Sequence, residues 1–123
     1  MKILVVEDEP AILRYIYKLL RTRGHEVLAL LCDGSDAAND ALEHVRHIRF
    51  DAVLVGYMMP GLTGTDAAVQ IKRLSAATHV VIMIERVPPD ETDRLQRQGI
   101  TFGQLPAPFE KEDLFRQLSV AAF

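Results

Sequence analysis

Between residues 51 and 61 the chain reads Asp51-Ala52-Val53-Leu54-Val55-Gly56-Tyr57-Met58-Met59-Pro60-Gly61. Residues 52–55 form an apolar run of strand length, as expected for a strand that is buried on both faces of a parallel sheet. Pro60 and Gly61 then indicate a loop. Gly56, which has no side chain, therefore lies at the carboxyl end of a predicted buried strand.

Similar apolar runs recur along the chain and alternate with amphipathic segments. Strands are also predicted at residues 3–6, 27–31 and 80–84, and a weaker one, interrupted by Gly103, at residues 102–105. Apolar residues at helical spacing predict helices in the intervening segments. The first helix is expected to begin at Pro10 and to end at Gly24. The next three are expected to begin at Ser35, at Thr65 with Asp66, and at residues 88–91, and the last helix is expected at residues 110–120.

This alternation predicts an α/β fold, because short buried strands joined by helices form parallel βαβ units. Five units in 123 residues make a small doubly wound sheet with helices on both faces. In such folds the functional site lies at the carboxyl ends of the strands. We expect one domain, residues 1–123.

Composition excludes several classes of function. The net charge is −3 without a basic block, which argues against nucleic-acid binding by this domain. No apolar run approaches the length of a membrane span. Cys32 is the single cysteine, so no internal disulfide forms, and we expect a cytoplasmic protein.

The predicted strands deliver four groups of residues to the functional edge. They are Glu7, Asp8 and Glu9; Gly56, Tyr57 and Met58; Glu85 and Arg86; and residues 106–109. No glycine-rich nucleotide loop and no Ser-His-Asp arrangement accompanies them.

Three motifs at these strand ends resemble the response-regulator receiver domain family. They are Ile3-Leu4-Val5-Val6-Glu7-Asp8-Glu9-Pro10, Met58-Met59-Pro60-Gly61-Leu62-Thr63-Gly64 and Pro106-Ala107-Pro108-Phe109. All three occur in family order and spacing, so the resemblance covers the whole chain. It implies a flavodoxin-like (βα)5 fold with strand order 2-1-3-4-5.

The resemblance also implies a phosphorylation site from which the essential groups are missing. In an active receiver, two acids and an acceptor aspartate hold Mg²⁺, a lysine and a Ser or Thr hold the phosphoryl group, and an aromatic side chain responds. Here the acids remain as Glu7 and Asp8, but the acceptor position is Gly56. Glu85 stands at the Ser/Thr position, Arg86 at the small residue after it, Ala107 at the lysine position and Gln104 at the aromatic position. A one-residue insertion near Gly99 would bring Phe102 closer to that last position.

Two interpretations of the acidic residues remain open. Glu7, Asp8 and Glu85 could hold a divalent cation, although the loss of a carboxylate at Gly56 leaves room only for weak Mg²⁺ binding. Alternatively, Glu7 and Asp8 cap the first helix and pair with Arg86. Arg86 itself either forms bidentate hydrogen bonds with these carboxylates or faces solvent.

We therefore predict a non-enzymatic pseudo-receiver that is not phosphorylated and that binds a protein partner or itself. The expected surface is formed by the fourth helix, fifth strand and fifth helix, where Phe115 and Phe123 would supply an exposed apolar strip. The alternative is a metal or small-ligand sensor that uses Glu7, Asp8 and Glu85. Asp51 is rejected as a substitute acceptor, because it precedes its strand and lies at the opposite sheet edge.

Overall fold

The five-stranded parallel sheet of the computed structural model has the predicted order. Its strands are β1 (Lys2–Glu7), β2 (Glu26–Leu31), β3 (Ala52–Gly56), β6 (His79–Met83) and β7 (Gly103–Gln104), arranged as β2-β1-β3-β6-β7. This arrangement corresponds to the expected order 2-1-3-4-5, because β4 (Met58–Met59) and β5 (Leu62–Thr63) form a separate antiparallel hairpin. The structure describes residues 1–106 and 108–122.

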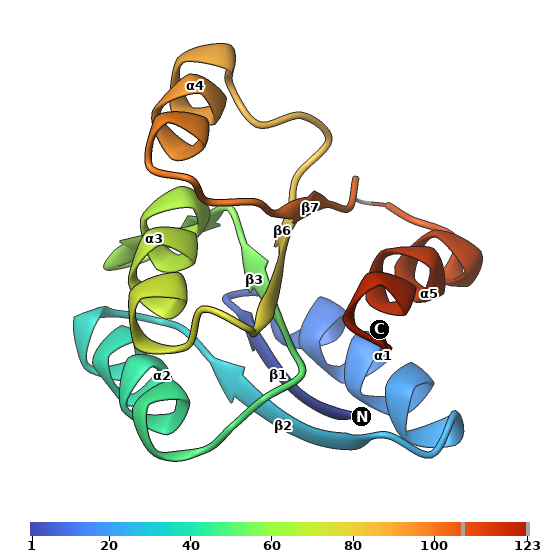
Figure 1. Cartoon of the computed structure of the whole chain (residues 1–123). Helices are drawn as coiled ribbons and strands as arrows, with labels where there is room; N and C mark the ends of the chain where they lie inside the picture. The colour runs from blue at the N-terminus through green and yellow to red at the C-terminus, as the bar shows by residue number, and fades with distance from the viewer. Residues whose placement is uncertain (107, 123) are drawn as a thin grey trace.

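Helices cover both faces of the sheet (Figure 1). Their bounds are α1 (Pro10–Thr22), α2 (Ser35–His47), α3 (Gly64–Leu74), α4 (Pro89–Arg97) and α5 (Lys111–Ser119), and a 3-10 turn follows at Val120–Ala122. Helices α1 and α5 lie on one face, and α2 and α3 lie on the other. In the described part of the chain, no helix combines the length and apolar character that a membrane crossing requires.

The central strands are buried because their side chains point alternately into two apolar cores. Leu4, Val53 and Ile82 belong to the core under α2 and α3, whereas Val5 and Leu54 belong to the core under α1 and α5. Each of these side chains is fully buried. A strand buried on both faces reads as a continuous apolar run, which explains why the sequence pattern located these strands.

Two predicted boundaries shift in the structure. Thr63, and not Thr65, is the N-cap of α3, and its hydroxyl accepts a hydrogen bond from the Asp66 amide at 3.3 Å. The predicted strand at residues 102–105 shortens to Gly103–Gln104, which pairs with Val81 and Ile82 of β6. Glycine contributes no side chain to packing, so a short edge strand is expected there.

Candidate functional site

The carboxyl end of β3 places Gly56 directly beneath the side chain of Glu7. Residues 3–6 of β1 pair in register with residues 52–55 of β3, so the ends of these neighbouring strands lie together. A Cβ atom added to Gly56 would lie 3.2 Å from each carboxylate oxygen of Glu7 and 3.2 Å from Cγ of Met59. The Glu7 carboxylate and Met59 therefore occupy the space that a side chain at position 56 would use.

The Glu7 carboxylate is unusual, because the residue is only 6% exposed and few hydrogen-bond donors contact it. Its Oε1 accepts hydrogen bonds from the backbone amides of Asp8 at 2.9 Å and Glu9 at 3.4 Å. Burial, reinforced by the neighbouring Asp8 side chain, raises the pKa of Glu7 from 4.5 to about 7. No ion pair to Glu7 occurs among residues 1–106 and 108–122. The carboxyl group is therefore partly protonated near neutral pH.

A hollow of about 390 Å³ opens at this edge, with acidic residues on its β1 side and apolar residues elsewhere. Met58, which is 73% exposed, forms part of its lining. The lining comprises Glu7, Asp8, Glu9, Ile12, Gly56, Tyr57, Met58, Met83, Ile84 and Phe109. Among the described residues that line the hollow there is no lysine or arginine, so no cationic side chain there attracts a phosphoryl dianion.

Glu85 and Arg86 do not line this hollow. Both are exposed and follow the end of β6. Arg86 makes no ion pair within the described residues. This agrees with a side chain that faces solvent and not with bidentate hydrogen bonds to the carboxylates. The described chain likewise contains no group of three His, Cys, Asp or Glu side chains placed to hold a metal ion. The predicted grouping of Glu7, Asp8 and Glu85 is therefore not formed, and neither is the alternative pairing of Glu7 or Asp8 with Arg86.

Gln104 is anchored to the loop between β6 and α4. Its side chain is half-buried, and its Oε1 accepts a hydrogen bond from the Val87 amide at 2.7 Å. Phe102 packs against the core under α2 and α3 instead of lining the hollow. Ala107, at the predicted lysine position, lies outside the described residues.

Asp51 lies at the opposite edge of the sheet, as predicted. It directly precedes β3, and its Oδ2 accepts a hydrogen bond from the amide of Lys2 at the start of β1, at 2.8 Å. Asp51 is therefore remote from the hollow that Glu7 lines.

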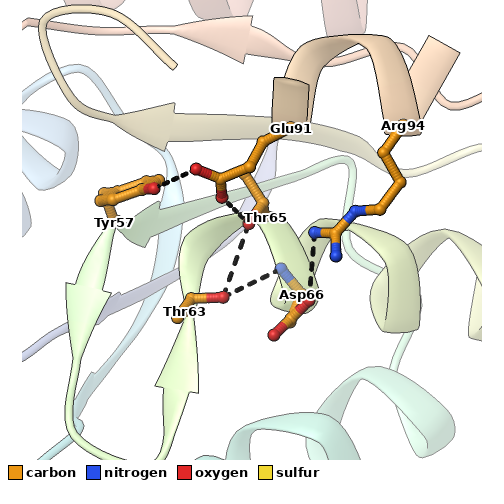
Figure 2. Close-up of polar contacts among 6 residues, drawn as sticks. All are labelled: Tyr57, Thr63, Thr65, Asp66, Glu91 and Arg94. Carbon is orange, nitrogen blue, oxygen red and sulfur yellow. Dashed lines mark hydrogen bonds and ion pairs between the residues drawn. The ribbon is translucent and has the colours of Figure 1, made fainter. Parts of the chain in front are cut away.

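A polar cluster that the sequence analysis missed joins the hollow to α4 (Figure 2). The Tyr57 hydroxyl donates to Oε2 of Glu91, and the Thr65 hydroxyl donates to Oε1 of the same carboxylate at 2.7 Å. The bond to Glu91 raises the pKa of Tyr57 to about 12. From the sequence, Tyr57 could be placed just after a strand and Glu91 in the first turn of a helix. Their contact could not be predicted, because the two residues are 34 positions apart in the chain.

Comparisons with known proteins agree on the family. The model described as the response regulator receiver domain matches residues 3–119. Protein PilH of Pseudomonas aeruginosa is 28% identical over 120 residues, covering 96% of this chain and 94% of PilH. The transcriptional regulatory protein TcrA of Mycobacterium tuberculosis is 31% identical over 119 residues, covering 96% of this chain but 44% of TcrA.

Solved structures give the same result. A receiver domain from Clostridium thermocellum has a TM-score of 0.77 and 28% identity, covering 98% of this chain and 92% of that one. The receiver domain of the sensor histidine kinase PA1611 from Pseudomonas aeruginosa has a TM-score of 0.76 and 26% identity, covering 97% and 94%. From its sheet order, its motifs and these matches, the chain belongs to the response regulator receiver domain family.

Proposed function

We propose that this chain is a receiver domain of two-component-type signalling that does not accept a phosphoryl group on an aspartate and acts instead as a protein-interaction module. The observation that carries the proposal is the Glu7 carboxylate in the space above Gly56. Aspartyl transfer needs a carboxylate nucleophile at that point, and glycine has no side chain to supply one.

The electrostatics of the hollow support the same conclusion. Phosphoryl transfer depends on cations that offset the charge of the transferring group. Glu7, Asp8 and Glu9 line the hollow, and no basic side chain joins them in the part of the chain that the structure describes. A dianion brought to this edge meets like charge.

The residues present do not fit a receiver-type magnesium centre. The structure of the PA1611 receiver is described with a magnesium ion coordinated in its active site cleft. Here the central carboxylate is absent at Gly56, and Glu7 is held by two backbone amides in the space that side chain would fill. Magnesium demands near-octahedral oxygen ligands, and Glu7 and Asp8 without a carboxylate at position 56 do not supply that arrangement.

The proposed partner surface is formed by α4, β7 and α5. Of the two residues of the predicted apolar strip, Phe123 lies outside the described residues. Phe115 packs against the core under α1 and α5, and the guanidinium of Arg23 lies 4.0 Å from its ring centroid. Among the described residues, the exposed large apolar side chains are Tyr15, Leu31, Met58 and Val120. The exposed residues of α4 and α5 are mostly charged or polar, namely Asp90, Asp93, Arg94, Gln96, Arg97, Lys111, Glu112, Arg116 and Ser119. Contacts through this surface would therefore be mainly polar.

Incubation with acetyl phosphate and Mg²⁺, followed by intact-mass measurement, tests the proposal. We expect no gain of a phosphoryl group under conditions in which a receiver domain with an acceptor aspartate is modified. Beryllofluoride with Mg²⁺ provides a second measurement, since it should leave the backbone amide resonances of residues 52–59 unchanged. A base-labile phosphoryl adduct would overturn the proposal.

A further inference from the structure

Glu91 is the point at which three segments of the chain meet. It lies in the first turn of α4, and its two carboxylate oxygens accept hydrogen bonds from Tyr57, just after β3, and from Thr65 in α3. Figure 2 shows both hydroxyls directed at this one carboxylate. The partners are 34 and 26 residues away in sequence, so the cluster is a tertiary contact and not a local helix cap.

The Thr65 hydroxyl depends on this acceptor. Thr65 is fully buried, and apart from a 3.5 Å contact with the Thr63 hydroxyl its oxygen bonds only to Glu91 among the described residues. A buried hydroxyl without a partner is costly. Hydrogen bonds to an ionised carboxylate are also stronger than bonds between neutral groups.

Helix α4 has few other attachments. Of its nine residues, Leu95 is the one that is buried. The preceding loop is held by the bond from the Val87 amide to Gln104, and the exposed pair of Arg94 and Asp66 is 3.3 Å apart. A short helix with one buried side chain opens readily unless polar contacts hold it.

We propose that Tyr57, Thr65 and Glu91 form a conformational latch that fixes α4 to α3 and to the loop after β3. Tyr57 also lines the hollow beside Gly56, so one side chain reaches from the hollow to α4. The latch adds two side-chain hydrogen bonds to the packing of Leu95, and these bonds set the position of the first turn of α4. It does not depend on whether the chain is phosphorylated, and breaking the hydroxyl–carboxylate bonds releases α4 while the sheet stays folded.

Amide hydrogen exchange of residues 92–97 measures the latch directly. We expect Tyr57→Phe and Thr65→Val each to speed this exchange about tenfold, because each removes one donor to a charged acceptor. The amides of β1 and β3 should keep their rates, which separates local opening from global loss of stability. Thr65→Ser retains the hydroxyl and should restore slow exchange.

Arg94→Gln is the matched control, because it removes the exposed pair between the same two helices and leaves the hydroxyl bonds in place. It should change exchange in α4 by less than about twofold. The proposal is overturned if Tyr57→Phe and Thr65→Val leave α4 unchanged, or if α4 and the β1 and β3 amides accelerate in parallel. It is also overturned if Arg94→Gln has as large an effect as Tyr57→Phe.

Discussion

Glu7 and Glu91 are two carboxylates that contact neighbouring residues, Gly56 at the end of β3 and Tyr57 just after it, and they have different surroundings. Glu7 is buried above Gly56, and among the described residues its carboxylate accepts hydrogen bonds only from the backbone amides of Asp8 and Glu9. Glu91 accepts hydroxyls from two other segments. From this difference we expect the Glu91 carboxylate, on which distant donors converge, to stabilise the fold, and the charged Glu7 carboxylate, which is buried without such donors, to destabilise it.

The largest effect is expected from Gly56→Asp, which places a second carboxylate against Glu7. The added Cβ would already contact both Glu7 oxygens at 3.2 Å. We expect a loss of about 3 kcal/mol in the free energy of unfolding at pH 8, measured by urea denaturation. The loss should be smaller at pH 5, where Glu7 is protonated.

Gly56→Ala separates charge from crowding in that experiment. It adds the same Cβ without a carboxylate, so it should destabilise the protein less than Gly56→Asp at pH 8. Equal losses for the two variants at pH 8 would show that charge at Glu7 does not matter.

Glu91→Ala tests the other carboxylate. It leaves the buried Thr65 hydroxyl and the Tyr57 hydroxyl without their acceptor. We expect a loss of about 2 kcal/mol in the free energy of unfolding at pH 7. Glu112→Ala, in the first turn of α5, is a suitable control, since Glu112 is exposed there. The comparison fails if both variants cost the same.

Glu7→Gln should stabilise the protein, which is the reverse of the usual result for a buried polar residue. The pKa of Glu7 is raised from 4.5 to about 7, so between these values the folded state binds more protons than the unfolded state. Stability from this group is therefore present below pH 4.5 and is lost as pH rises through 7. We expect a gain of about 1.5 kcal/mol at pH 8 that disappears near pH 5. Parallel stability curves for the two proteins between pH 5 and 8 would contradict this account of Glu7.

Arg94→Gln should have the smallest effect. Its partner Asp66 lies 3.3 Å away, and both side chains are about half exposed. Exposed pairs contribute little, so we expect a change below about 0.5 kcal/mol in the free energy of unfolding. A loss equal to that of Glu91→Ala would place the stabilising contact between α3 and α4 at the ion pair instead of the hydroxyls.

The sequence predicted the sheet better than the site, and particular residues explain why. Residues 52–55 were predicted as a strand because all four are apolar, and the structure buries each of them. Their position then places Gly56 at the functional edge of the sheet. The start of α3 was predicted two residues late, because the Thr65 hydroxyl bonds to Glu91 while Thr63 caps the helix. A threonine that caps a helix cannot be distinguished in the sequence from a threonine that donates a hydrogen bond to a distant residue.

The arrangement around Gly56 could be predicted only in part. That position 56 corresponds to the acceptor aspartate was predicted from the resemblance to receiver domains. The placement of Glu7 above Gly56 depends instead on the direction that one side chain takes after its strand ends. Glu85 was expected to join Glu7 and Asp8, yet it is exposed just beyond β6. Where a side chain points after its strand has ended is not set by periodicity.

The central claim is that no atom at this sheet edge takes a phosphoryl group, and intact mass after treatment with acetyl phosphate and Mg²⁺ tests it most directly. The account predicts an unchanged mass for this chain alongside a phosphorylated receiver that retains its aspartate. A phosphoryl adduct on Glu7, Asp8 or any other carboxylate would contradict it.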